Sequence, residues 1–184
     1  MSVTLRDDSG AGLDYVRMAL GWDPVRPRRW FGRPHKDIDL NAAALLFTED
    51  RIIDVVYHEQ LSSADGSVRH FGDSTTGRGK GDNEIITVDL TRLPSPITTV
   101  IFIVTCYSGQ TFEQIDNAFC RVVDAVSGTE ITRYDLRGGG SHTGLVMGKL
   151  VHTDAVWRFH TIGAAIHAQH PVEAISQLGA FVQT

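Results

Sequence analysis

The sequence predicts an all-β fold, a two-sheet β-sandwich with one or two short helices. Three observations carry this prediction. Nine short apolar runs rich in Val, Ile, Thr and Phe follow one another along the chain. Eighteen glycines supply turns between them, and few of the intervening stretches have helical periodicity. Many short strands separated by turn signals favour a sandwich over an α/β fold.

The nine apolar runs are the expected strands. Runs such as 85–90 and 130–136 alternate between apolar and polar residues, as a half-buried strand requires. The run 99–107 includes five consecutive apolar residues, Val100 to Val104, and predicts a central strand. In chain order the expected strands are 16–20, 38–47, 52–57, 85–90, 99–107, 118–124, 130–136, 145–151 and 156–166.

Turns and helices are marked more locally. Ser127-Gly128-Thr129 predicts a hairpin turn, and 111–115 predicts a single helical turn. The segment 171–179 predicts a C-terminal helix, because it has a proline at its first position, an acidic first turn and Gly179 at its end.

Length and composition limit the class of protein. A chain of 184 residues without internal repeats or a linker predicts one domain, 1–184, with a core from about 13 to 170. The formal net charge of −5 argues against general nucleic-acid binding. No apolar run approaches the roughly 18 residues of a membrane span, and no signal peptide is visible. Cys106 and Cys120 lie among apolar residues and predict buried thiols in a reducing compartment, the cytoplasm.

The segment 65–84 differs from the expected strands. Five of its twenty residues are glycine, and ordering such a loop costs conformational entropy that its few apolar residues cannot offset. Ca²⁺ takes about six to eight oxygens from carboxylates, amides, carbonyls and water, and a bound cation would order the loop. The candidate ligands are the side chains of Asp65, Asp73, Asp82, Asn83 and Glu84, with backbone carbonyls that the glycines allow to turn inward.

A second set of oxygens lies upstream, at 37–41. Asp37, Asp39 and Asn41 share one face of an extended chain, while the apolar residues between them enter the core. An EF-hand is rejected, because Ala42 stands where that loop needs glycine and Thr48 where it needs glutamate. The sequence therefore predicts an acidic strand face that meets the glycine-rich loop.

Other interpretations of the loop stay open at this point. It can be a solvated connection in which Asp and Gly serve only turns. It can also belong to a metal-dependent phosphoesterase or nucleotide-binding protein with Arg78 and Lys80 as phosphate ligands, although G-x-x-x-x-G-K-[ST] is absent. No catalytic residue is predicted. Ser141 lacks the G-x-S-x-G context, and the i, i+3 pair His167 and His170 has no accompanying ligand motif and indicates a surface pair.

Several of these segments together resemble the TerD-type tellurium-resistance family, in matching order from about residue 13 to 163. The segments are Leu20-Gly21-Trp22-Asp23, Asp37-Ile38-Asp39, 65–73, 76–84 and Arg133-Tyr134-Asp135-Leu136. The resemblance implies a bacterial, cytoplasmic β-sandwich linked to tellurite resistance and other stress responses. It further implies a non-enzymatic protein that binds Ca²⁺ through acidic loops and acts with other stress-response proteins.

Carried over by residue, the resemblance makes Asp37 and Asp39 the family's acidic strand pair and Asp73 the aspartate of its Gly-Asp step. Asp82 and Glu84 become the ends of its Asp-Asp-Glu run. Asn83 stands where the family usually has aspartate, so one or two ions are expected, the second held weakly. Weaker candidate ligands are Asp65 and the carbonyls around Gly66, Gly77 and Gly79. The chain also departs from the family pattern in two places. Glu59 could compensate as a carboxylate if it points inward, and the first strand is reduced to 13–20.

Overall fold

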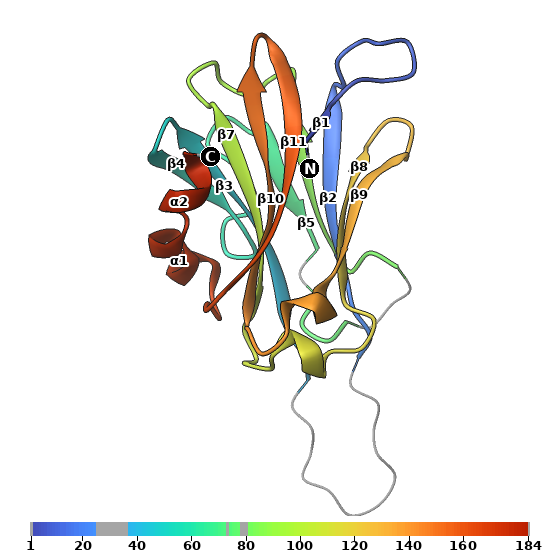
Figure 1. The fold of residues 1–184 in the computed structure, drawn as a ribbon, viewed down its shortest axis with the longest axis vertical. Helices are drawn as coiled ribbons and strands as arrows, with labels where there is room; N and C mark the ends of the chain where they lie inside the picture. Colours follow the sequence, from blue (N-terminus) through green and yellow to red (C-terminus); the bar gives the residue numbers. More distant parts are fainter. Residues whose placement is uncertain (1, 25–36, 73, 78–80, 184) are drawn as a thin grey trace, which may run out of the picture.

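The computed structural model describes residues 2–24, 37–72, 74–77 and 81–183. Two antiparallel sheets pack face to face (Figure 1), which confirms the predicted sandwich. The six-stranded sheet has the order β1 (Ser2–Thr4), β11 (Val156–Ile166), β10 (Gly144–Thr153), β7 (Thr99–Cys106), β3 (Leu40–Thr48) and β4 (Arg51–Val56). The five-stranded sheet has the order β5 (Val68–Phe71), β6 (Glu84–Asp89), β2 (Tyr15–Gly21), β8 (Phe119–Asp124) and β9 (Glu130–Asp135).

All nine expected strands form, and no end differs from its predicted position by more than two residues. Two further strands, β1 and β5, lie outside those nine. In β1, Val3 pairs with Phe159 of β11 and the next residue but one, Leu5, is buried. The sandwich therefore begins before residue 13, and the expected reduction of the first strand to 13–20 is wrong.

Strand β5 lies inside the segment that was predicted to be a loop. Its residues alternate, with Val68 and His70 buried and Arg69 and Phe71 exposed. It pairs with β6, so that Val68 lies opposite Val88. The glycine-rich connection is therefore shorter than predicted, because it starts only after Phe71.

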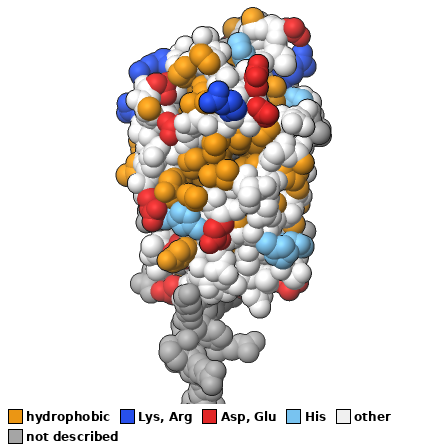
Figure 2. All heavy atoms as spheres, turned by 90° about the vertical axis from the view of Figure 1, so that its left-hand side faces the viewer, with side chains coloured by type: hydrophobic (Ala, Val, Ile, Leu, Met, Phe, Trp, Pro, Cys, Tyr) orange, Lys and Arg blue, Asp and Glu red, His pale blue; other side chains and the backbone are white. Residues whose placement is uncertain are grey.

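The main core lies between the two sheets, and a second apolar layer covers the outer face of the six-stranded sheet. Every residue of β7 is buried, since alternate side chains enter one layer or the other. The outer layer is closed by the C-terminal segment of α1 (Pro171–Ala174), η3 (Ile175–Gln177) and α2 (Gly179–Val182) (Figure 1). Figure 2 shows this face, with apolar side chains across its middle.

The predicted local signals are largely confirmed. Pro171 is the first residue of α1, and His170 and Glu173 form a capping box. Gly179 does not end the helical segment as predicted, because a second short helix, α2, begins there. The expected turn at 111–115 is the 3-10 turn η1 (Phe112–Gln114), and Gly128 has the positive φ of a hairpin turn, +76°. Within the described residues, no helix is long and apolar enough to span a membrane.

Lys149 of β10 connects the C-terminal segment to the sheet. It is only 3% exposed, and its Nζ donates to the carbonyls of Phe181 (2.7 Å) and Val182 (3.3 Å). Desolvation lowers the pKa of Lys149 below the ordinary value of a lysine.

Replacing Lys149 by methionine should loosen the C-terminal segment without unfolding the sandwich. Methionine keeps the apolar stem but removes two hydrogen bonds, a loss of about 1–2 kcal/mol in local stability. Amide hydrogen exchange over residues 176–183 should become faster. Arg158→Met is the matched control, because Arg158 lies on the neighbouring strand β11, opposite Val151 rather than Lys149. Equal exchange rates in the two variants would contradict the role of Lys149.

Candidate metal site

Most of the predicted ligands lie at one end of the sandwich, where β2 and β9 end and β3, β6 and β8 begin (lower end in Figure 1). We call this end, formed by residues 21–24, 37–41, 74–77 and 81–84, the loop end. It holds Asp37, Asp39, Gly77, Asp82, Asn83 and Glu84.

Trp22 joins the acidic strand segment to the glycine-rich loop. Its indole Nε1 donates to the carbonyl of Ile38 (3.1 Å), and its backbone N–H donates to Oδ1 of Asn83 (2.9 Å). The same ring lies against Gly77, where a Cβ would come within 2.4 Å of the indole. The side chain is 2% exposed, so the two segments meet on a fixed, buried aromatic surface. Trp22 is not among the residues that the sequence predicted for the site.

The segment 37–41 has the predicted alternation. Asp37 is exposed, Asp39 is half-buried, and Ile38 and Leu40 enter the core. Asn41 is buried, and its Nδ2 donates to Oδ1 of Asp39 (3.3 Å), so the two polar side chains share a face as predicted. The backbone of Asp39 is held at both ends, because its N–H donates to Ser108 Oγ (2.9 Å) and its carbonyl accepts from Tyr107 (2.9 Å).

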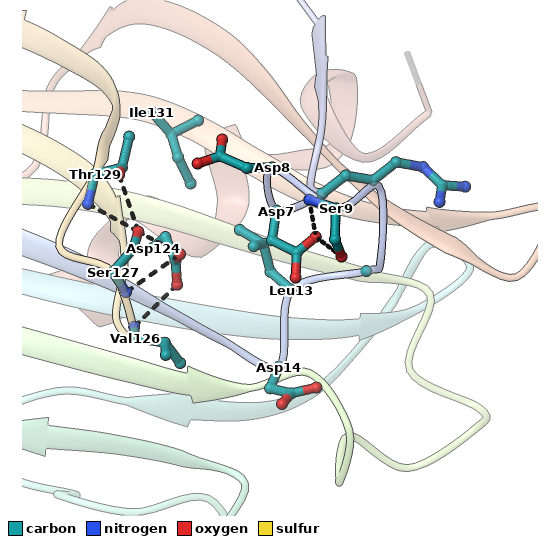
Figure 3. Close-up of a pocket in the computed structure, with 12 residues that line it drawn as sticks. Asp7, Asp8, Ser9, Leu13, Asp14, Asp124, Val126, Ser127, Thr129 and Ile131 are labelled. Carbon is teal, nitrogen blue, oxygen red and sulfur yellow. Dashed lines mark hydrogen bonds between the residues drawn. The ribbon is translucent and has the colours of Figure 1, made fainter.

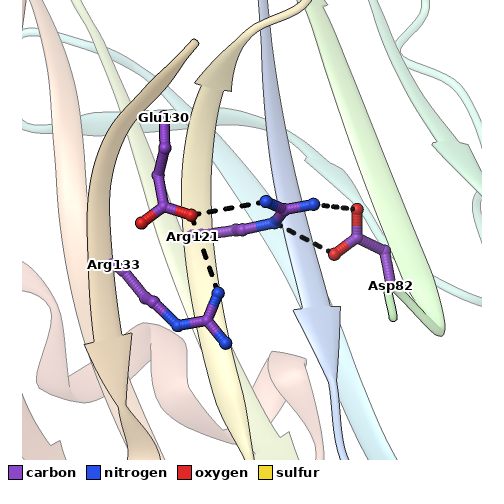
Figure 4. A network of polar contacts seen from close by, with 4 residues as sticks. All are labelled: Asp82, Arg121, Glu130 and Arg133. Carbon is purple, nitrogen blue, oxygen red and sulfur yellow. Dashed lines mark hydrogen bonds and ion pairs between the residues drawn. The ribbon is translucent and has the colours of Figure 1, made fainter. Parts of the chain in front are cut away.

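Asp82 forms a two-bond ion pair with Arg121 of β8 (Figure 4). Nε of Arg121 is 3.1 Å from Oδ1 and Nη2 is 2.9 Å from Oδ2 of the aspartate. Arg121 also pairs with Glu130 (3.3 Å), which in turn pairs with Arg133 (3.6 Å). These carboxylates, Asp82 above all, raise the pKa of the Arg121 guanidinium. Strand β2 lies between β6 and β8, so nothing in the local sequence marks Arg121 as the partner of Asp82.

Glu84 is the innermost of the predicted ligands. It is the first residue of β6, faces the interior and is 0% exposed. Its Oε2 accepts the backbone N–H of Ala42 (2.7 Å) and lies 3.4 Å from Nε2 of the fully buried His70 side chain. Strand β4 pairs with β3 only from Ala44 onward. The N–H of Ala42 therefore has no acceptor on β4 and donates to the carboxylate of Glu84 instead. Glu84 therefore links the two sheets across the core.

Asp65 does not lie with the other predicted ligands, which corrects that part of the prediction. It precedes β5, whose first residue lies opposite Val88, whereas Glu84 starts β6. The length of β6, about 16 Å, separates them. Burial of Asp65 raises the pKa, but hydrogen bonds from Ser67 and Ser63 outweigh it and hold the pKa below the usual range. The candidates Asp73 and Gly79, and Arg78 and Lys80 of the phosphate alternative, lie outside the described residues.

The donors at the loop end have the chemistry that a hard divalent cation requires. They are carboxylate, amide and backbone carbonyl oxygens, the ligand types of Ca²⁺. Asp82 can bridge a cation and Arg121, since each carboxylate oxygen has two lone pairs. Within the described part of the chain, these carboxylates do not form a group of three with all ligand atoms within 4.8 Å. An ion here would therefore also need carbonyl or water oxygens.

A second acidic group lies at the opposite end of the sandwich, around a cavity of about 370 Å³ (Figure 3). Two of its carboxylates, Asp7 and Asp124, are used by the turns that contain them. Asp7 accepts from the backbone of Ser9 and Ala11, and Asp124 accepts from Val126 and Ser127. The Ser127 hydroxyl, donating at 2.5 Å, and these amides hold the pKa of Asp124 below its ordinary value. This group stabilises turns and does not resemble a ligand site.

The fold and the loop end together define an antiparallel β-sandwich protein with oxygen donors gathered at one end. The TerD domain matches residues 2–175. The chain belongs to the TerD family of tellurium-resistance and stress-response proteins.

Relatives and a solved structure agree with this assignment. Tellurium resistance protein TerZ of Serratia marcescens is 40% identical over 168 residues, covering 89% of this chain and 86% of the relative. Stress response protein SCP2 of Bacillus subtilis (strain 168) is 33% identical over 180 residues, covering 91% and 90%. The crystal structure of SAV2460, a protein of unknown function, has a TM-score of 0.79 at 27% identity and covers 91% of this chain and 98% of its own.

Proposed function

We propose that this protein binds one or two Ca²⁺ ions at the loop end and acts as a non-enzymatic binding or scaffold module in a cytoplasmic stress response. One observation supports the site above all: Trp22 contacts Ile38, Gly77 and Asn83 at once, and so gathers oxygen donors from two distant segments. Asp37, Asp39 and Asp82 are the proposed carboxylate ligands. Calcium would stabilise the folded protein by mass action, because the unfolded chain does not keep these segments together.

The two cysteines favour a binding role over redox chemistry with tellurite. Both thiols are free and buried, and burial raises the pKa of each. The thiolate is the reactive form of cysteine, so neither side chain is activated at neutral pH. Resistance would then depend on what the calcium-loaded protein contacts. The partners we propose are other stress-response proteins.

Calorimetric titration with Ca²⁺ tests the site through a pair of variants that separates coordination from ion pairing. Asp82→Asn removes the charge, and should weaken calcium binding by at least about tenfold if the carboxylate is a ligand. Arg121→Met breaks the same ion pair but leaves the carboxylate, so calcium binding should be unchanged or tighter. Equal weakening in both variants would mean that the ion pair matters rather than coordination.

Asp65→Asn is the control for general charge effects, because Asp65 lies at the other end of β6. It should titrate like the unmodified chain. Thermal unfolding with Ca²⁺, with Mg²⁺, and with Mg²⁺ plus ATP tests the enzymatic alternative. Stabilisation by Ca²⁺ alone supports the binding module, whereas stabilisation only by Mg²⁺ with ATP would favour a nucleotide-binding protein.

A further inference from the structure

Three potential metal ligands meet on the outer face of the six-stranded sheet, where the chain leaves β4 and where it enters α1. His58 and Glu59 follow β4, and His170 precedes α1. One ligand atom from each lies within 4.8 Å of the others, the only such group among the residues that the structure describes. Figure 2 shows histidine and acidic side chains side by side in the lower half of this face. We propose that His58, Glu59 and His170 bind a transition-metal ion such as Zn²⁺.

The distances are close to those of a loaded site. Nε2 of His58 is 3.9 Å from Oε1 of Glu59, and Nε2 of His170 is 3.6 Å from Oε2. Ligand atoms at about 2.0–2.1 Å from a tetrahedral Zn²⁺ lie about 3.3 Å apart. The three ligand atoms lie within 4.8 Å of one another, so closing the site requires shifts of up to about 1.5 Å. The Glu59 side chain is 62% exposed and can make them, whereas the histidines are 17% and 22% exposed and more firmly packed.

Neighbouring groups orient the ligands. The Tyr57 hydroxyl donates to Oε2 of Glu59 (3.1 Å), and the Tyr57 ring packs edge-on against both imidazoles. The two imidazole centroids are 5.6 Å apart. Nδ1 of His58 is buried and has no hydrogen-bond partner among the described residues, so no hydrogen bond there fixes the tautomer of this ring. Such contacts to the ligands are typical of functional metal sites.

His170 couples the site to the C-terminal segment. Its Nδ1 accepts the N–H of Val172 (3.2 Å) as the helix N-cap, so in the neutral ring the proton is on Nε2, facing Glu59. Coordination through Nε2 moves that proton to Nδ1 and breaks the cap. The loss of one capping bond lowers metal affinity by about fivefold. This loss is small compared with the affinity that two imidazoles and a carboxylate supply.

The donor set predicts selectivity that differs from that of the loop end. Imidazole nitrogens favour Zn²⁺, Ni²⁺ and Cu²⁺, whereas Ca²⁺ prefers oxygens. The ion would also connect the turn after β4 to the start of the C-terminal segment, and so fasten the outer layer of the sandwich. This inference is independent of calcium binding, since it uses none of the proposed calcium ligands.

Calorimetric titration with ZnCl₂ in the presence of millimolar calcium tests the site. The unmodified chain should bind one Zn²⁺ tightly enough to give a sharp transition, and Co²⁺ should give visible absorption bands of a four-coordinate ion. His58→Gln, Glu59→Gln and His170→Asn should each weaken zinc binding by about tenfold or more. Asparagine is a good N-cap, so His170→Asn should fold normally.

The control is His152→Gln, whose ring stacks on Trp157 away from the site, and it should titrate like the unmodified chain. Hydrogen exchange gives a second measurement, because zinc should accelerate exchange of the Val172 amide in the unmodified chain. Zinc titrations of the three site variants that match the unmodified chain would overturn the proposal. So would a Val172 amide that zinc leaves fully protected.

Discussion

Replacing Glu84 by alanine should destabilise the protein by about 1–3 kcal/mol or more, because it leaves buried polar groups without their hydrogen-bond acceptor. The variant leaves the N–H of Ala42 and the imidazole of His70 in a closed interior without their carboxylate partner. It also removes a hydrogen bond that joins β6 to β3. Urea unfolding at neutral pH measures the loss as a lower midpoint at unchanged slope.

Glu130→Ala is the comparison for this experiment. Glu130 also pairs with basic side chains, Arg121 and Arg133, but its own side chain is 38% exposed. Surface ion pairs contribute about 0–1 kcal/mol, so this variant should stay close to the unmodified chain. The stability of Glu84→Gln should lie between those of the two alanine variants, because its amide oxygen can still accept the N–H of Ala42. Equal effects of the two alanine variants would show that burial of Glu84 adds nothing.

Replacing Gly77 by alanine should displace the glycine-rich loop from Trp22. Gly77 has φ of +66°, which costs an alanine about 1–2 kcal/mol, and its Cβ would come within 2.4 Å of the indole ring. Overpacking adds about 1–3 kcal/mol, for a total of about 2–5 kcal/mol. The emission of Trp22 should shift as the ring gains water, and calcium binding should weaken, since the loop carries Asp82 and Asn83.

Gly81→Ala separates the steric contact from backbone strain. Gly81 also has a positive φ, +89°, but a Cβ there meets nothing within 4 Å. Its replacement should cost only the backbone strain of about 1–2 kcal/mol and leave the emission of Trp22 in place. If both alanine variants have the same stability and spectrum, the packing of Gly77 on Trp22 does not hold the loop.

The fold could be predicted from sequence because each long strand is an apolar run bounded by turn residues. Strand β7 shows this most clearly, since two apolar layers require apolar residues at consecutive positions. Strands β1 and β5 could not be found in this way. Each is three or four residues long, and β5 buries only Val68 and His70, a pattern too short to separate from loop.

The site could be predicted only in part. Asp37, Asp39, Asp82, Asn83 and Glu84 do lie at one end, as expected from the alternation in 37–41 and the resemblance to the TerD family. Asp65 does not, because it precedes the unrecognised strand β5, which carries the chain from the other end of the sheet toward the loop end. Arg121 pairs with Asp82 because of the strand order, and Ala42 is free to donate to Glu84 because β4 pairs with β3 only from Ala44 onward. The local sequence predicts neither of these features.

The group of His58, Glu59 and His170 was not predicted from sequence either, because its members come from distant segments. Glu59 points to His170 rather than toward the loop end, although 110 residues of chain separate His170 from Glu59. The histidine that the sequence pairs with His170, His167, instead stacks with His142 at a centroid distance of 4.7 Å. Spacing within one segment therefore could not indicate the residues that lie beside His170.

The outer apolar layer depends on the C-terminal segment from Pro171 onward to keep it from water. A chain cut before Pro171 would expose Leu45, Ile101, Ile103 and Val146 to water. Contiguous apolar surface of this kind promotes self-association. Shortened versions of this protein should therefore aggregate even though both sheets are intact, and an expression tag is better placed at the N-terminus than next to Val182.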